Sequence, residues 1–139
     1  MKNDTEDLVA ALQRAREAEK EQALFYRALA AAAEERGDAA LAERFNELHA
    51  DEQHHLSRLT ARLLELEAAP HELPAAPLPF GLDGWEEVAA AREQGEVARY
   101  EGMLEHGGRV DDHTAALLRE ILDTERHHAA ELGGKWTTA

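Results

Sequence analysis

Two segments of the sequence share a pattern in which a glutamate is followed three positions later by a histidine. They are Glu52–His55 and Glu125–His128. On an α-helix, residues three apart lie on the same face about one turn from each other, so each pair directs a carboxylate and an imidazole toward one point. Carboxylate oxygens and imidazole nitrogens are both ligands for divalent metal ions. The pattern therefore predicts metal ligands on two separate helices.

Two further glutamates repeat in step with these pairs. Glu19 lies seven residues before Tyr26, and Glu93 lies seven residues before Tyr100. Each of these glutamates also precedes the glutamate of one Glu-x-x-His pair by 32 or 33 residues. The sequence therefore contains an internal repeat of two halves. We expect the two halves to pack around a pseudo-twofold axis and to build one site together.

The elements that must position these residues are helices. Hydrophobic residues recur every three to four positions in four segments, which predicts amphipathic helices over roughly 5–36, 39–68, 84–106 and 112–132. The linker 69–83 contains all four prolines and is long enough to cross the length of a bundle. We therefore predict an all-α fold over a single domain, 1–139: a four-helix bundle of two antiparallel hairpins joined by a Pro-rich crossover.

Residues that favour helix ends fall at the predicted boundaries. Gly37 is expected to end the first helix and Asp38 to cap the second. Asp83 with Glu86 resembles a capping box for the third helix. The first and fourth helices each have two candidate caps, which are Asn3 or Asp4 and Asp111 or Asp112.

The four repeated glutamates occupy inward positions where a simple bundle would have Leu or Ala. Ionised carboxylates there are very unfavourable unless they are neutralised, and two divalent cations would neutralise them. Four carboxylates and two imidazoles from four helices form the ligand set of known dimetal carboxylate bundles. The alternative is a metal-free helical interaction module, which would have to keep its buried acids protonated through strongly raised pKa values.

With these residues in place, the chain from Leu8 to Leu132 resembles the ferritin-like superfamily, and within it the rubrerythrin-like and bacterioferritin-like di-iron proteins. The resemblance implies that Glu52 and Glu125 bridge two metal ions. It also implies that each ion is completed by one more carboxylate and one histidine, which are Glu19 with His55 and Glu93 with His128.

Further residues near the predicted ligands have roles implied by the same resemblance. Glu96, one turn after Glu93, is similar to an extra metal-binding glutamate of rubrerythrins, and Gly95 beside it suggests a π-bulge that turns Glu96 inward. Asp51 resembles an aspartate that holds the histidine of the opposite half, here His128. The equivalent position before Glu125 is Thr124, a departure from the repeat.

Two tyrosines and two histidines complete the candidates. Tyr26 and Tyr100 are expected to face the site from behind the ligands, where they would bond a ligand rather than react themselves. His54 and His127 are adjacent to the metal-binding histidines and therefore point about 100° away, toward solvent or an interface.

For function, the resemblance favours a rubrerythrin-like peroxidase that lacks the rubredoxin domain. The sequence has no cysteine, so an external electron donor is required. The alternative is a ferroxidase that handles iron, although no fifth helix is expected after Gly134, as a full ferritin cage would have. An oxygenase is a further possibility.

The expected cofactors are two iron ions, with manganese as the other candidate. No haem is expected, because Gln53 lies where haem-binding bacterioferritins have a Met nearby.

Composition excludes several classes of partner. The formal net charge is −14, and no basic patch is present, which argues against nucleic acid and anionic membranes. No hydrophobic run approaches the roughly 20 residues of a membrane span, and no signal region precedes the first helix, so we expect a cytoplasmic protein. Family resemblance and hydrophobic linker residues favour a homodimer or larger homo-oligomer.

Overall fold

The computed structural model of the chain describes residues 4–73, 81–105 and 110–132. Within these ranges it contains four α-helices and no β-strand. The helices are α1 (Asp4–Glu35), α2 (Ala39–Glu65), α3 (Trp85–Glu105) and α4 (Asp112–Leu132). The predicted all-α class is confirmed.

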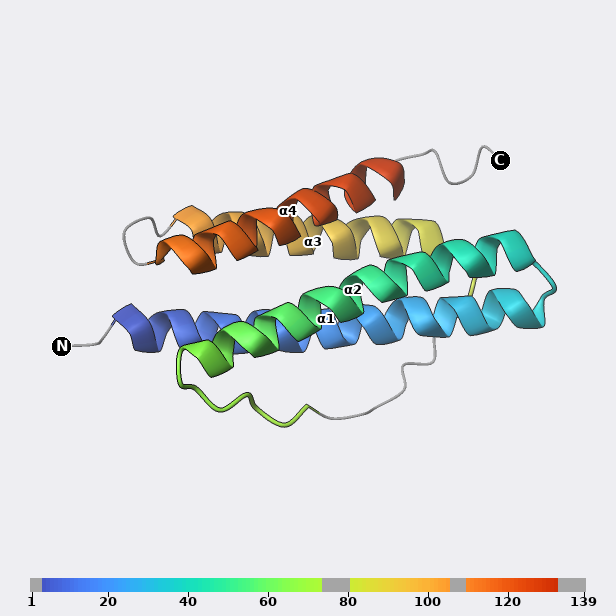
Figure 1. Cartoon of the computed structure of the whole chain (residues 1–139). Helices are drawn as coiled ribbons and strands as arrows, with labels where there is room; N and C mark the ends of the chain where they lie inside the picture. Colours follow the sequence, from blue (N-terminus) through green and yellow to red (C-terminus); the bar gives the residue numbers. More distant parts are fainter. Residues whose placement is uncertain (1–3, 74–80, 106–109, 133–139) are drawn as a thin grey trace.

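The four helices form a bundle of two antiparallel hairpins, α1 with α2 and α3 with α4 (Figure 1). In Figure 1, α2 and α3 run in the same direction, so the chain must travel the length of the bundle between them. The two hairpins with a long crossover are therefore confirmed. Of the predicted linker, residues 74–80 lie outside the described part of the chain.

A glycine and an aspartate make the turn between α1 and α2, as predicted. Gly37 has a φ of +80°, in the left-handed region that glycine adopts without steric penalty. The amide of Asp38 then donates to the carbonyl of Ala33 at 2.9 Å, which closes the end of α1. The carboxylate of Asp38 accepts a hydrogen bond from the amide of Leu41 at 3.1 Å and caps α2.

The end of α2 differs from the prediction. The helix ends at Glu65, three residues before the predicted boundary, because Glu67 adopts a φ of +61°. The following linker is held against α1: Gln13 Nε2 donates to the carbonyl of Ala69 at 2.9 Å, and the amide of His71 donates to Gln13 Oε1 at 3.0 Å. The hydrophobic pattern continues past Glu65, but these contacts hold the following residues beside α1 instead.

The starts of α3 and α4 are capped differently. The amide of Val88 donates to the carbonyl of Gly84, which places Gly84 at the N-cap position of α3; the predicted capping box with Asp83 as the cap is therefore wrong. At α4, Asp111 rather than Asp112 is the cap, because its carboxylate accepts bonds from the amide and hydroxyl of Thr114 at 2.9 and 2.8 Å. The candidate cap Asn3 lies outside the described residues.

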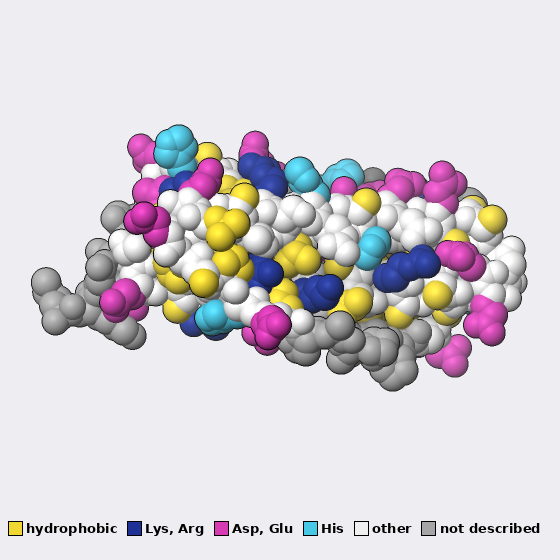
Figure 2. Space-filling view, turned by 60° about the horizontal axis from the view of Figure 1, so that its bottom comes forward, with side chains coloured by type: hydrophobic (Ala, Val, Ile, Leu, Met, Phe, Trp, Pro, Cys, Tyr) yellow, Lys and Arg dark blue, Asp and Glu magenta, His cyan; other side chains and the backbone are white. Residues whose placement is uncertain are grey.

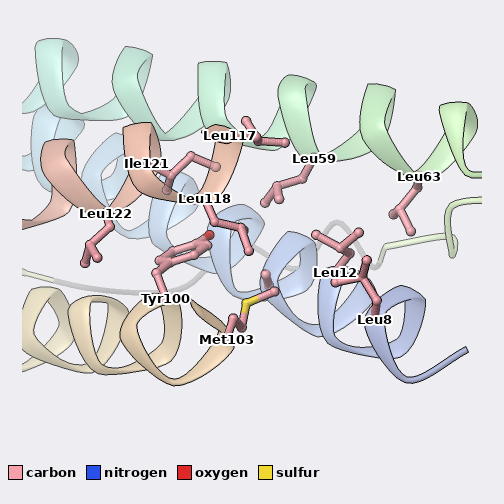
Figure 3. Packing of buried hydrophobic residues seen from close by; sticks show 11 residues of the cluster. Leu8, Leu12, Leu59, Leu63, Tyr100, Met103, Leu117, Leu118, Ile121 and Leu122 are labelled. Atoms are coloured by element: carbon pink, nitrogen blue, oxygen red, sulfur yellow. The ribbon is translucent and has the colours of Figure 1, made fainter. Parts of the chain in front are cut away.

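Two hydrophobic clusters fill the bundle, one toward each end. The first includes Leu12, Leu63, Met103 and Leu118, and Figure 3 shows side chains of this cluster, Tyr100 among them, pointing inward from all four helices. The second gathers other side chains from all four helices: Phe25, Tyr26, Leu29, Ala30, Ala33, Ala42, Phe45, Leu48, Trp85, Ala89 and Leu132. The glutamates of the repeat lie in sequence between the members of these two clusters on every helix.

Most charged side chains lie on the surface of the bundle. Figure 2 shows acidic side chains toward the edges and ends of one face, with basic and separate hydrophobic side chains along its middle. Among the described residues, Leu64 and Val88 are the large hydrophobic side chains that are exposed. None of the helices described has the length and hydrophobicity needed to cross a membrane.

Candidate metal centre

The six residues of the repeated pattern converge at the middle of the bundle. Glu19 comes from α1, Glu93 from α3, and the two Glu-x-x-His pairs from α2 and α4. All four glutamates are 0% exposed, and the two histidines are buried as well. Each lies on the inward stripe of its helix, so the periodicity that builds the core also directs these polar groups into it.

The six side chains form two overlapping groups of four among the described residues. Within each group, one potential ligand atom from every residue lies within 4.8 Å of the others: Glu19, Glu52, His55 and Glu125 in one group, and Glu52, Glu93, Glu125 and His128 in the other. Since Glu52 and Glu125 belong to both groups, their carboxylates lie between the two imidazoles.

The first half of the centre is the potential metal position formed by the side chains of Glu19 and His55, which we call the Glu19–His55 position. His55 Nδ1 lies 3.5 Å from Glu19 Oε1 and 3.2 Å from Glu52 Oε1. The hydroxyl of Tyr100, from α3, donates to Glu19 Oε2 at 2.6 Å. One oxygen of Glu19 is therefore held by the tyrosine while the other faces the centre.

The second half, the Glu93–His128 position, has the same plan. His128 Nδ1 lies 3.3 Å from Glu93 Oε2 and 3.1 Å from Glu125 Oε1. The hydroxyl of Tyr26, from α1, donates to Glu93 Oε1 at 3.0 Å. Each tyrosine thus bonds the glutamate of the opposite half, and the two bonds are related by the symmetry of the repeat. Burial raises the pKa of Tyr26 well above its usual value, so Tyr26 stays a donor.

Both histidines present Nδ1 to the carboxylates, but only one of them has a hydrogen-bond partner for Nε2 among the described residues. His128 Nε2 lies 2.9 Å from Asp51 Oδ2, which confirms the predicted contact. With its proton on Nε2 directed to Asp51, His128 presents Nδ1 to the carboxylates. At the equivalent position, the hydroxyl of Thr124 donates to the carbonyl of Glu120 instead, at 3.2 Å. Within the described residues, no hydrogen bond holds His55 Nε2.

Nine buried side-chain nitrogen and oxygen atoms of the described structure have no hydrogen-bond partner, and all of them belong to this centre or to the adjacent Glu96. They are Glu19 Oε1, Glu93 Oε2, Glu96 Oε1, both carboxylate oxygens of Glu52 and of Glu125, His55 Nδ1 and His128 Nδ1. Leaving so many buried polar atoms unpaired is very unfavourable. A pair of divalent cations would satisfy them, so the donor set fits a dimetal site.

Burial perturbs the titration of these groups in the metal-free state. Burial and the nearby carboxylates of Glu19 and Glu125 raise the pKa of Glu52 well above its usual value. Burial raises the pKa of Glu125 to about 8, although contact with His128 opposes the shift. Burial lowers the pKa of His128, but its contacts with Glu125 and Glu93 outweigh burial and raise that pKa to about 11. Cations would therefore displace protons when they bind.

Glu96 is buried beside the centre but lies outside both groups of four. Its Oε2 is 3.7 Å from Arg99 Nε. Burial, followed by the charge of Glu19, raises the pKa of Glu96 to about 7. The predicted π-bulge at Gly95 is wrong, because α3 is a regular α-helix through this point.

Two residues that sequence reasoning did not single out support the ligand Glu93, Gln22 by direct contact and Arg92 through Gln22. Gln22 Nε2 donates to Glu93 Oε1 at 2.9 Å, and Arg92 Nε donates to Gln22 Oε1 at 2.8 Å. Gln22 lies on the predicted inward face of the first helix, one turn after Glu19. The available signal was that a buried glutamine on such a face must find hydrogen-bond partners.

The other histidines of the described residues lie outside the centre. His54 and His127 are exposed, as predicted, and His127 Nε2 pairs with Glu131 Oε1 at 3.1 Å. His49 Nδ1 contacts the carbonyl of Ala23 at 2.9 Å and so links α2 to α1.

The comparisons with known proteins agree with this architecture. A sequence model of the Ferritin family, described as a ferritin-like domain, matches residues 9–137, and the chain belongs to that family. No curated protein matches the chain in sequence.

Solved structures with this fold include two bacterioferritins. The Desulfovibrio desulfuricans bacterioferritin, described with its diiron site in different catalytic states, is 20% identical with a TM-score of 0.84, over 95% of this chain and 81% of the other. The Rhodobacter capsulatus bacterioferritin, described with a metal-free dinuclear site and haem iron, is 24% identical with a TM-score of 0.81, over 95% of this chain and 84% of the other. At these identities the likeness concerns the fold alone.

Proposed function

We propose that this chain binds two iron ions at the metal centre and oxidises Fe(II) as part of iron handling. The observation that carries the proposal is the convergence of unpaired buried carboxylate and imidazole atoms on one point. Membership of the ferritin-like family and the fold shared with bacterioferritins, one of which is described with a diiron site, support iron over other divalent metals. They also favour iron oxidation over the peroxidase first expected from the sequence.

The protein residues have distinct roles in this proposal. Glu52 and Glu125, which belong to both groups, would bridge the two ions. The other four residues would complete them as two pairs, Glu19 with His55 and Glu93 with His128. When bound, two Fe(II) ions supply two electrons, which suffice to reduce O₂ to hydrogen peroxide or hydrogen peroxide to two waters.

The surroundings of the site favour this chemistry. The hydrophobic clusters on both sides exclude bulk water, which strengthens every electrostatic interaction between them. Tyr26 and Tyr100 donate to the outer carboxylate oxygens, and Asp51 fixes the orientation of His128. These contacts hold the ligands in place without using the atoms that face the metals.

One observation favours a second candidate, a rubrerythrin-like peroxidase. Glu96 places an additional buried carboxylate close to Glu19, where it would be able to join the ligands when the oxidation state of iron changes. Because the sequence contains no cysteine, re-reduction would require an electron donor outside these residues.

The test loads metal-free protein with two equivalents of Fe(II) without oxygen and then mixes it with O₂ or with hydrogen peroxide. Formation of Fe(III), followed by its absorbance, is expected to be much faster than in buffer and to stop after two irons per chain in the first turnover. Glu52→Gln with His128→Ala should return the rate to that of buffer. A control variant, Glu43→Gln, changes an exposed glutamate of α2 and should leave the rate unchanged.

The outcomes separate the candidates. Continued oxidation and retention of many irons per chain on repeated addition supports iron handling. Rapid reaction with peroxide but not with O₂, slowed by Glu96→Gln and not by the exposed Glu87→Gln, supports the peroxidase. Fewer than about one metal bound per chain, with no loss of thermal stability on chelation, would instead leave a metal-free interaction module.

Several expectations stay predictions. These are iron rather than manganese, the absence of haem, an external donor, self-association into a homodimer or larger oligomer, and the cytoplasmic location. Metal analysis of protein purified without chelator addresses the first directly, and the visible absorption spectrum of the same protein addresses the second.

A further inference from the structure

Gln22 belongs to one half of the repeat but contacts the ligand of the other half. It lies on α1, three residues after Glu19, and its side chain is buried. Its amide nitrogen donates to Glu93 Oε1 on α3, and its amide oxygen accepts from Arg92. The guanidinium of Arg92 in turn lies over the ring of Phe25, 4.7 Å from the ring centroid. These residues form a continuous chain of contacts that ends at Glu93.

Arg92 and Glu93 together fix which end of the Gln22 amide faces the metal centre. A guanidinium has only hydrogen-bond donors, so the amide oxygen must face Arg92. The amide NH₂ is then directed to Glu93. If Arg92 were absent, the amide oxygen would lose this partner and the side chain of Gln22 would be held at Glu93 alone.

Two donors therefore hold the same oxygen of Glu93. Gln22 donates to Oε1 at 2.9 Å, and Tyr26 donates to it at 3.0 Å. The other oxygen, Oε2, has no hydrogen-bond partner and lies 3.3 Å from His128 Nδ1. The carboxylate is thus fixed with one oxygen presented toward the metal.

The equivalent support is missing from the other half. The counterpart of Gln22 is Glu96, one turn after Glu93, but among the described residues Glu96 makes no hydrogen bond to Glu19, and its Oε1 has no hydrogen-bond partner. Among the described residues, Glu19 Oε2 accepts a side-chain bond from Tyr100 but from no glutamine. The histidine of that half, His55, also lacks the aspartate that holds His128.

We infer that Gln22, oriented by Arg92, is a positioning residue that tightens divalent-cation binding specifically at the Glu93–His128 position. The two metal positions are consequently unequal although the repeat that builds them is nearly symmetric. This inference rests on the dimetal centre of the proposed function. Pre-organised ligands bind more tightly because less conformational freedom is lost on binding.

The experiment measures Co(II) binding by its visible absorption in two single-position backgrounds. His55→Ala retains the Glu93–His128 position, and His128→Ala retains the Glu19–His55 position. Gln22→Met, which keeps the side-chain volume and removes the donor, is added to each background. We expect Co(II) affinity to fall by about 10-fold or more in the His55→Ala background and to be unchanged in the His128→Ala background. Arg92→Met should act in the same direction as Gln22→Met.

A matched control separates positioning from general loss of stability. Gln13 is also a buried glutamine of α1, but its amide holds the linker at Ala69 and His71. Gln13→Met should lower the melting temperature and leave Co(II) affinity unchanged in both backgrounds.

The inference is overturned if Gln22→Met has no effect on affinity or weakens Co(II) binding equally in both backgrounds. If a single-histidine variant does not fold, the comparison is made in the full site, where Gln22→Met must weaken only one of the two binding steps. Absence of Co(II) binding to the unaltered protein is a different result, since it removes the dimetal centre and with it the proposed function.

Discussion

Glu52 shows why ionised carboxylates are unfavourable in the metal-free centre. It is fully buried, and neither of its carboxylate oxygens has a hydrogen-bond partner in the described structure. Its pKa is raised by burial and by three other glutamates of the site. In a protein without a bound cation, a carboxylate in this environment opposes folding whenever it is ionised.

Replacing Glu52 by Gln is therefore expected to stabilise the metal-free protein while abolishing tight metal binding. The neutral amide has nearly the same shape and carries no charge, so the free energy of unfolding at about pH 8 should rise by roughly 1–3 kcal/mol. Denaturant unfolding of chelator-treated protein measures the change. Glu43→Gln, at an exposed position of α2, should have little effect. A metal-free Glu52→Gln protein less stable than the original would contradict the electrostatic account.

At the residue scale, the sequence predicted which side chains face inward but not all of their partners. The 3.6-residue period assigns a face to each residue, which placed Glu19 and Glu93 at the centre. It does not specify side-chain rotamers or contacts between helices, so the link from Arg92 through Gln22 to Glu93 could not be predicted. Such links depend on the distance between α1 and α3, which only the packed bundle defines.

Among the helices, the ends of α1 and α2 form the same kind of turn with different residues. Gly37 and Glu67 both have positive φ values, of +80° and +61°. The left-handed conformation carries no steric penalty for glycine but costs about 1–2 kcal/mol for most other residues. The sequence predicted the first turn because it has a glycine, and it placed the end of α2 too late because Glu67 gives no such signal.

A reciprocal pair of substitutions tests this difference. Glu67→Gly should raise the free energy of unfolding by about 1 kcal/mol, because glycine relieves the left-handed strain. Gly37→Ala should lower it by about 1 kcal/mol for the converse reason. Thermal or denaturant unfolding of metal-free protein measures both changes. If Glu67→Gly destabilises the protein, then contacts of Glu67, rather than the conformation of its backbone, dominate at the end of α2.

The course of α3 shows why a local signal can mislead. Gly95 suggested a π-bulge, yet Ala89, Glu93, Glu96 and Tyr100 are all buried and follow one another at intervals of three or four residues. A regular helix therefore already brings Glu96 inward. A Cβ added at Gly95 would meet no atom within 4 Å, so the glycine lies at an open part of the helix surface and is not required by close packing.

In the molecule as a whole, an acidic layer lies between two hydrophobic clusters. Tyr100 belongs to one cluster and Tyr26 to the other, and both donate hydrogen bonds into the layer. The clusters hold the helices together. The carboxylates of the layer between them must be neutralised, either by binding protons or by binding metal cations. The stability of the bundle is therefore coupled to both pH and metal.

This coupling predicts that metal-free protein becomes less stable as pH rises. Burial raises the pKa of Glu125 from its usual value of 4.5 to about 8. Between these values the folded state binds more protons than the unfolded state, so the free energy of unfolding falls as pH rises. His128 acts in the same direction from about 6.5 upward, because its folded pKa is raised to about 11. The melting temperature should thus fall by several degrees from about pH 5.5 to about pH 8.

Two controls separate the effect of the buried acidic layer on stability from the effect of the negative charge on the protein surface. High salt screens surface repulsion more than interactions between buried groups, so the fall should persist there, and Glu125→Gln should make it shallower. Saturating divalent metal should reverse the trend, since the ligands bind metal in their deprotonated forms and metal stabilisation grows with pH. A metal-free melting temperature at about pH 8 equal to or above that at about pH 5.5 would show that the acidic layer does not control stability.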